Sequence, residues 1–166
     1  MFWIKSRAIF LPYSLLILLI FASSFSGCGS FGSDGGNGVF GNQNSFALDS
    51  AGFGHIVYNS PAGLKYATNK NGGWVKELIT AKNSSPTLAV DKNGHCHVVY
   101  YDPSNGLYVY TNNISGAWAD QTIQSGAGYN YSASLVLDDS SNPHVAFSCT
   151  NLGFKEAMVY YANRQG

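Results

Sequence analysis

The sequence predicts an all-β fold made of three repeats, each folded into short antiparallel strands. Charged residues make up only 11% of the chain, whereas aromatic residues reach 14% and glycine occurs 19 times. Such a composition favours strands and tight turns over helices. Short runs of alternating apolar and polar residues also recur along the chain, separated by turn residues. The 166 residues leave room for one ordinary domain.

Residues 1–27 are predicted to be an export signal that is not part of the fold. Lys5 and Arg7 precede an almost purely apolar run over residues 8–22, and small residues then lead to Cys28. This order is typical of a secretory signal. With a cysteine at the cleavage site it resembles the bacterial lipoprotein signal, which implies lipidation of Cys28 and anchoring in the cell envelope, at the outer membrane. An uncleaved membrane anchor is the alternative, because the apolar run is marginally long enough to span a bilayer.

Residues 28–44 are rich in glycine, serine and asparagine and show no periodicity, so we expect a flexible tether. Beyond it, Cys96 and Cys149 are the two remaining cysteines. They stand at non-equivalent places in the repeats, and a bridge between them would need a geometry that their positions do not provide. Two buried free thiols are therefore predicted.

The repeats cover residues 45–166, in copies at about 45–80, 86–124 and 133–166. In each copy an alternating run ends at an aspartate, a histidine follows six residues later, and an aromatic residue stands three residues beyond. An asparagine closes a later segment of each copy. The recurring residues are Asp49, Asp91 and Asp138; His55, His97 and His144; Tyr58, Tyr100 and Phe147; and Asn69, Asn112 and Asn163.

Each copy divides into strands in the same order. The first strand ends at the aspartate, and the D-S-A-G and D-K-N-G turns place Gly52 and Gly94 where a positive φ is needed. The second strand starts at the histidine, the third ends at the asparagine, and the fourth begins near Trp74 or Trp118. Four antiparallel strands in about 40–50 residues is the period of a β-propeller blade.

The third copy is predicted to lack its fourth strand, so the fold expected is an open array of three blades, the last one incomplete. Three blades cannot close a ring, because propellers need about four or more. Two interpretations stay open. The chain is part of a larger propeller, or two chains pair as a homodimer into a ring of six blades.

Two stretches, Ala47 to Tyr58 and Thr68 to Trp74, resemble the bacterial propeller repeats related to sialidase-type (BNR or Asp-box) blades. The second stretch departs from the Asp-box motif, because Asn71 stands where an aspartate is usual. The resemblance implies a propeller fold over residues 45–166. It leaves the function open, since one propeller scaffold hosts many functions.

The recurring polar residues are interpreted as structural. We expect Asp49, Asp91 and Asp138 to accept hydrogen bonds from the backbone of the turns that they start. We expect His55, His97 and His144 to join neighbouring strands through a side-chain bond. A catalytic role is disfavoured, because an active site normally departs from a repeat.

The two repeat tryptophans, Trp74 and Trp118, are predicted to be hydrophobic anchors between blades. Their alternative role is to stack on a sugar ligand. His95 and His97 lie two residues apart and could share one edge of a metal site. The spacing offers no third ligand, so neither a metal nor another cofactor is predicted.

Enzymatic activity is disfavoured by composition. Sialidases of the fold that these repeats resemble bind a carboxylate with several arginines. In this chain Arg164 is the only arginine after Cys28. No nucleophile elbow, zinc-protease motif or P-loop occurs. Positive and negative side chains balance at nine each, which gives no electrostatic reason to expect nucleic acid as a partner.

Two functions remain. The first is a non-catalytic lipoprotein of the cell envelope whose propeller surface binds a glycan or another protein. The alternative is a truncated remnant of a sialidase-like, glycan-processing propeller enzyme. The scarcity of arginine favours the first.

Overall fold

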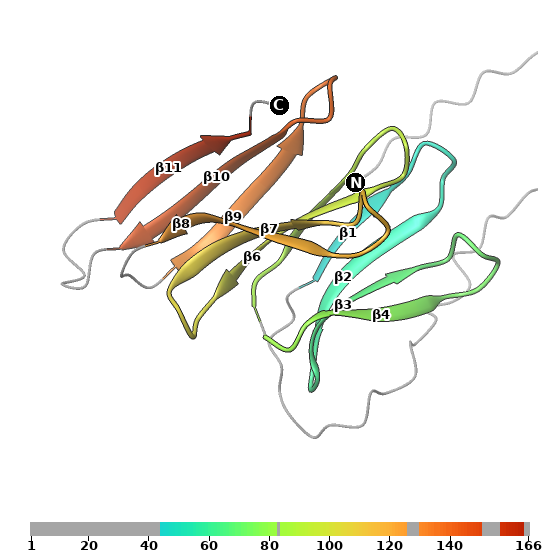
Figure 1. Cartoon of the computed structure of the whole chain (residues 1–166), viewed down its shortest axis with the longest axis horizontal. Helices are drawn as coiled ribbons and strands as arrows, with labels where there is room; N and C mark the ends of the chain where they lie inside the picture. Colours follow the sequence, from blue (N-terminus) through green and yellow to red (C-terminus); the bar gives the residue numbers. More distant parts are fainter. Residues whose placement is uncertain (1–43, 83, 126–129, 151–156, 165–166) are drawn as a thin grey trace, which may run out of the picture. The chain divides into compact units, whose positions relative to one another are not determined.

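The structure is a computed structural model that describes residues 44–82, 84–125, 130–150 and 157–164. The predicted signal, Cys28 and the tether up to residue 43 lie outside the described residues. The described part forms eleven strands in three antiparallel sheets (Figure 1). None of its segments is a helix long and apolar enough to cross a membrane.

The strands of each sheet follow one another along the chain as an antiparallel meander. The first two sheets have four strands each and the third has three among the described residues, which confirms the all-β fold class. The first sheet contains β1 (Asn44–Leu48), β2 (Gly54–Ser60), β3 (Gly63–Thr68) and β4 (Val75–Thr80). The second contains β5 (Thr87–Val90), β6 (Cys96–Asp102), β7 (Leu107–Asn112) and β8 (Ala119–Ser125), and the third β9 (Asn130–Leu137), β10 (Pro143–Thr150) and β11 (Ala157–Asn163).

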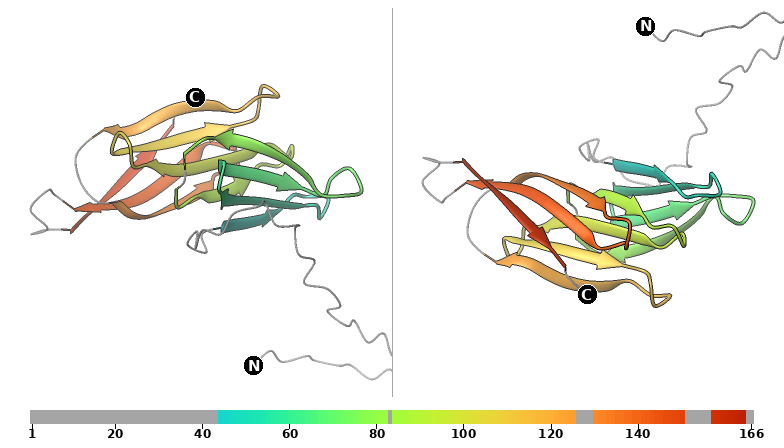
Figure 2. Two further views of the ribbon diagram at one scale, coloured as in Figure 1. Left: turned by 90° about the horizontal axis from the view of Figure 1, so that it is seen from below. Right: turned by 90° about the horizontal axis from the view of Figure 1, so that it is seen from above.

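The second sheet lies between the other two (Figure 2). Its two faces form two separate cores. One core joins the first and second sheets and includes Val57, Leu64 and Tyr100; the other joins the second and third and includes Val99 and Phe147. The first strands of successive sheets also adjoin, since the backbone N–H of Leu88 in β5 donates to Ser45 Oγ in β1 at 3.1 Å. Meanders that stack face to face with their first strands adjacent are arranged as β-propeller blades are.

Each blade has two distinct faces, which we name by the direction of the chain. The forward face points toward the following blade and carries the recurring histidine; in the first two blades it carries His55 and His97. The backward face points toward the preceding blade, as Cys96 and Trp118 of the second blade do. Neighbouring residues of a strand alternate between the two faces of a sheet. The strand pairing therefore places His144, Ala146 and Tyr161 on the forward face of the third blade, and Phe46 and Gly54 on the backward face of the first.

A short connection locks the first two blades together through polar contacts. Ser84 donates its N–H to Asn59 Oδ1 at 3.0 Å, accepts from the Asn59 side-chain amide on its carbonyl, and accepts the Tyr101 N–H on its hydroxyl at 2.6 Å. Lys82 pairs with the fully buried Asp102 at 2.5 Å. Burial works to raise the pKa of Asp102, but the bonds from Lys82 and the following turn outweigh it and hold the pKa below its usual value.

The tight turns after the aspartates have the predicted left-handed residue. Gly52 has a φ of 84° and Gly94 of 81°, and Ser141 takes the same place in the third repeat with a φ of 66°. Serine tolerates this region less readily than glycine. The turn geometry therefore persists in the third repeat although its glycine does not.

One register that the sequence suggested is wrong by one residue. Asn112 and Asn163 pair across the strands with His97 and His144, but the residue opposite His55 is Thr68. The counterpart of Asn69 is Asn113: their side-chain oxygens accept the N–H groups of Gly54 and Cys96, at 2.8 and 2.7 Å. Among the described residues Cys96 is a free, buried cysteine; the side chain of Cys149 lies outside the described part.

Candidate functional site

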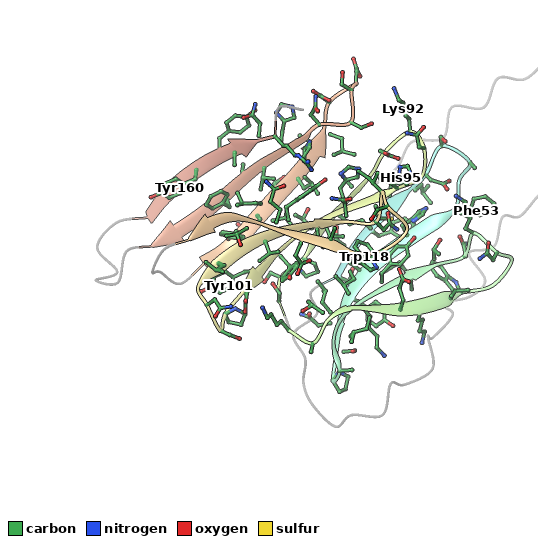
Figure 3. The ribbon with its side chains drawn as sticks, viewed as in Figure 1. Phe53, Lys92, His95, Tyr101, Trp118 and Tyr160 are labelled. Carbon is green, nitrogen blue, oxygen red and sulfur yellow. The ribbon has the colours of Figure 1, made fainter. Side chains whose placement is uncertain are left out.

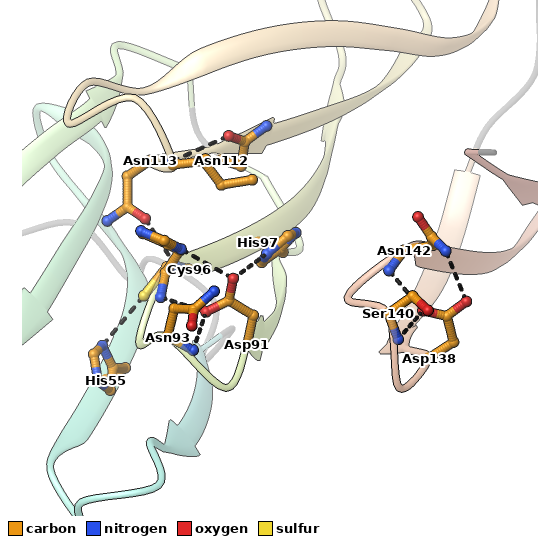
Figure 4. Close-up of polar contacts among 12 residues, drawn as sticks. His55, Asp91, Asn93, Cys96, His97, Asn112, Asn113, Asp138, Ser140 and Asn142 are labelled. Carbon is orange, nitrogen blue, oxygen red and sulfur yellow. Dashed lines mark hydrogen bonds and ion pairs between the residues drawn. The ribbon is translucent and has the colours of Figure 1, made fainter. Parts of the chain in front are cut away.

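The aspartates of all three repeats make the same contacts with their turns. Oδ1 of Asp91 accepts the N–H groups of Asn93 and His95, at 2.9 and 2.8 Å (Figure 4). Asp49 and Asp138 accept the two corresponding N–H groups of their own turns, at distances between 2.7 and 2.9 Å. The carboxylates thus satisfy backbone donors that the tight turn leaves without partners.

Each aspartate also begins a chain of three side chains that crosses neighbouring strands. In the first blade Asp49 Oδ2 lies 3.4 Å from His55 Nε2, and His55 Nδ1 lies 2.6 Å from the hydroxyl of Tyr66. The second chain is Asp91–His97–Tyr110, with 3.7 and 2.6 Å, and the third is Asp138–His144–Tyr161, with 3.5 and 2.6 Å. A phenol that donates to Nδ1 places the ring hydrogen on Nε2, where it faces the carboxylate.

Burial sets the electrostatics of these chains. It raises the pKa of the Tyr66 and Tyr110 phenols, so both remain protonated donors. Burial lowers the pKa of His97, which keeps that ring neutral despite the nearby Asp91. For Asp91 burial acts upward, but the bonds from His95 and from the turn amides outweigh it, so its pKa lies below the usual value. The chain is therefore a neutral His–Tyr pair beside an ionised carboxylate.

Both shifts in the second blade predict loss of stability in acid. A histidine whose folded pKa is lowered contributes stability above its unfolded pKa of about 6.5, and the contribution is lost as the pH falls below that value. The lowered pKa of Asp91 acts in the same direction, but only below about pH 4. His55 and His97 are each 1% exposed, so the rings of the first two chains are covered by protein, and the structural role of these positions stays a prediction.

The aspartates provide a graded stability test. Replacing Asp91 with alanine should lower the free energy of unfolding by about 1–3 kcal/mol, because two turn amides lose their acceptor in a buried setting. Asp138→Ala removes the same bonds where the side chain is 38% exposed instead of 4%, so water replaces the lost acceptor and the loss should be smaller. Chemical denaturation of both variants measures the difference. Equal losses would show that burial does not set the strength of these bonds.

Trp118 packs between the first two blades. Its ring packs edge-on against Tyr66 with 5.4 Å between centroids, and its indole N–H donates to Glu77 at 2.8 Å (Figure 3). Trp74, the corresponding residue of the first blade, lies over Gly54 beside Phe46 and is 42% exposed. The structure thus gives the two tryptophans different surroundings, and sugar stacking on either ring stays a prediction.

A cavity of about 140 Å³ lies between the second and third blades, at the place that Trp118 fills between the first two. Tyr110 and Gln121 line it, and they correspond in register to Tyr66 and Glu77, the two residues that contact Trp118. In the described residues no tryptophan enters this second place. The remaining lining comes from Thr122, Ile123, Pro143, Val145, Ala162, Asn163 and Arg164.

The chemistry of the cavity is that of a small binding site. One wall is apolar or aromatic, from Tyr110, Ile123 and Val145, and the rim carries the side-chain amide of Gln121 and the Arg164 guanidinium. Asn163 also borders the cavity, but it pairs with His144, so its side chain lies on the forward face of the third blade. Among the described residues, the lining contains no Asp, Glu, His, Ser or Cys, and so no carboxylate pair. Its hydroxyl groups are those of Tyr110 and Thr122.

Among the described residues, no group of three or more His, Cys, Asp or Glu side chains is arranged to hold a metal ion. His95 Nδ1 contacts Asp91 Oδ2 at 3.0 Å and its side chain is 36% exposed, whereas His97 is buried in its own blade. Both rings are thus committed to the same aspartate.

Sequence reasoning missed two features of this region. The three tyrosines that bond to the histidines recur as Tyr-x-Thr or Tyr-x-Asn, in K-Y-A-T, V-Y-T-N and Y-Y-A-N, so an alignment of the third strands could have found them. The cavity left no such signal. It depends on which side chain fills the space between blades, and the lining residues come from four strands of two repeats.

Comparison with solved structures finds chains that are similar to this one, among them a lectin. No family model matches the chain, and no curated protein matches it, so the sialidase-type resemblance stays a prediction. A fucose lectin from Kordia zhangzhouensis, solved in complex with methyl-fucoside, matches 72% of this chain and 91% of its own, with 18% identity and a TM-score of 0.49. At this identity the likeness concerns the arrangement of strands and says nothing of a ligand.

Proposed function

We propose that this protein is a non-catalytic, lipid-anchored protein of the cell envelope that binds glycans in the cavity between its second and third blades. The observation that carries the proposal is the lining of the cavity, in which an aromatic and aliphatic wall faces the amide of Gln121 and the guanidinium of Arg164. A sugar ring needs both kinds of surface. Its C–H face packs on apolar side chains, and its hydroxyl groups exchange hydrogen bonds with amides and charged donors.

The size of the cavity favours one sugar ring over a long chain. A buried cavity of about 150 Å³ binds a molecule of the size of benzene, and this cavity has about 140 Å³, so it has no room for several sugar rings. The site is open to solvent on one side, because Gln121 and Arg164 are exposed. One ring can therefore enter while the rest of a glycan remains outside.

The lipid anchor is the second part of the proposal. It rests on the order of Lys5, Arg7, the apolar run and Cys28, with the glycine-rich segment as a tether between the lipid and the blades. In the outer membrane this arrangement would present the cavity to polysaccharides or glycoproteins near the membrane surface.

Binding is tested with the full chain against a panel of monosaccharides that includes fucose, galactose, mannose, N-acetylglucosamine and sialic acid, by titration calorimetry. Gln121→Ala and Arg164→Ala should each weaken the binding of the preferred sugar by about tenfold, the effect of one lost hydrogen bond. Asn71→Ala and Lys92→Ala, which remove an exposed amide and an exposed cation outside the cavity, should leave the affinity unchanged. Absence of binding to every sugar, or equal effects of all four changes, would contradict the proposal.

A further inference from the structure

We propose that the forward face of the third blade binds the backward face of the first blade of a second copy of this chain, so that two chains close a ring of six blades. The structure leaves large apolar side chains exposed on these two faces. They are Phe46, Leu48, Trp74 and Leu78 on the first blade and Val136, Val159 and Tyr161 on the third, each between 42% and 80% exposed. Exposed patches of this kind mark interaction surfaces.

The two faces are the register copies of faces that already pack inside the chain. On the forward side, His144 and Tyr161 repeat the His55–Tyr66 pair that the second blade covers. On the backward side, Phe46 and Gly54 occupy the positions of Leu88 and Cys96, which pack against the first blade. The partner's blade is thus expected to sit as the second blade sits on the first.

Individual contacts of the internal interface predict those of the new one. The Leu88 N–H donates to Ser45 Oγ. Phe46 stands at the position of Leu88, and Ser134 at that of Ser45, so we expect the Phe46 N–H of one chain to donate to Ser134 Oγ of the other. Trp118 packs on Tyr66, and the counterparts are Trp74 and Tyr161. Ser134 and Tyr161 are both exposed on the third blade, where such partners could reach them.

Side-chain sizes on the two faces compensate for each other, and this points to a second copy as the occupant. The internal interface packs Leu88 with Val57. Their counterparts are the larger Phe46 and the smaller Ala146. A hollow lies on the forward face of the third blade where the small residues gather, lined by Ser132, Ser134, Ala146, Ser148 and Val159 together with Ala133 and Phe147.

Charge also favours a covered surface. The described strand residues on the forward face of the third blade include no Asp, Glu, Lys or Arg. Proteins normally place charges on exposed sheets to prevent association. This uncharged face at one end of the chain pairs head to tail with the face at the other end, whose apolar residues stand beside Lys65 and Lys76. Head-to-tail contacts form a closed ring when the rotation between copies allows it.

The oligomeric state of the full chain in nonionic detergent, measured by sedimentation with the detergent contribution subtracted, tests the proposal. We expect a mass of two chains over a wide range of concentration. Phe46→Glu and Val159→Glu place a charge on one face each and should raise the dimer dissociation constant by about 100-fold or more, because an unpaired charge would be buried. Ile114→Glu, a change at a 51% exposed apolar residue in the turn between β7 and β8, is the matched control and should leave the dimer intact.

Mixing the two variants distinguishes head-to-tail pairing from pairing of like faces. A mixed dimer keeps one unaltered interface, so dimer should reappear when Phe46→Glu and Val159→Glu chains are combined. If like faces paired, one of the two variants would dimerise as the wild type does. That result, a wild-type monomer, or a mass that grows beyond two chains would each overturn the closed ring. Thermal melting of each variant confirms that it is folded.

Discussion

Replacing Gly63 with alanine should lower the free energy of unfolding by about 4 kcal/mol or more, a loss near the upper end for single substitutions. Gly63 starts β3 with a φ of 122°, a conformation that other residues rarely adopt. An added Cβ would lie 2.2 Å from the carbonyl oxygen of Thr80 and 2.6 Å from Cα of Ala81. These are backbone atoms of the neighbouring segment, so only a separation of β3 from the end of β4 can relieve the clash.

Gly52→Ala is the matched control for this effect. Gly52 also has a positive φ, 84°, but nothing lies within 4 Å of an added Cβ. Only the conformational penalty of about 1–2 kcal/mol then applies. Chemical denaturation of the two purified variants measures both losses. If the two variants lose similar amounts of unfolding free energy, the close approach of the backbone at Gly63 does not make this position intolerant of a side chain.

Replacing Cys28 with serine should remove the protein from the membrane fraction or leave its signal uncleaved. The thiol is the atom that a lipoprotein signal would lipidate, and one serine hydroxyl cannot take its place. Fractionation of cells, together with the mass of the mature chain and labelling with a radioactive fatty acid, measures the change. Because stable anchoring depends on acyl chains in the bilayer, the shift between fractions should be nearly complete.

The control for this experiment is Cys149→Ser, which changes a cysteine far from the signal in the sequence. That variant should fractionate and be processed as the wild type is. If Cys28→Ser also behaves as the wild type, the lipid anchor is wrong and the N-terminal segment acts as an ordinary signal or as an anchor.

The strands of the three sheets could be predicted from the sequence because each copy of the repeat has similar turn residues at the same places. Asp49, Asp91 and Asp138 mark where each first strand ends, and β4 and β8 begin one residue after Trp74 and Trp118. The alignment of the third strands was less certain, because the hairpins that precede them differ in length between the copies. The hairpin between β6 and β7 is longer than that between β2 and β3, and aligning asparagines across it shifted the register by one residue.

The candidate binding site could not be predicted in the same way. Gln121 looks like an ordinary exposed strand residue in the sequence, and its significance depends on the space between two blades. Trp118 closes that space in one place, and the second place stays open. A repeat predicts what its copies share, whereas a site that arises from a difference between copies needs the packed structure.

The buried thiol of Cys96 makes the separation of the first two blades measurable in the native protein. Its sulfur lies 3.2 Å from His55 Nδ1 of the preceding blade, and burial raises its pKa to about 11. Alkylating reagents attack the thiolate, which this pKa keeps scarce and the packing keeps inaccessible. Modification of Cys96 must therefore await a local opening, and its rate in native buffer reports how often the two sheets part. The same measurement could follow whether a bound sugar or a second chain slows the motion.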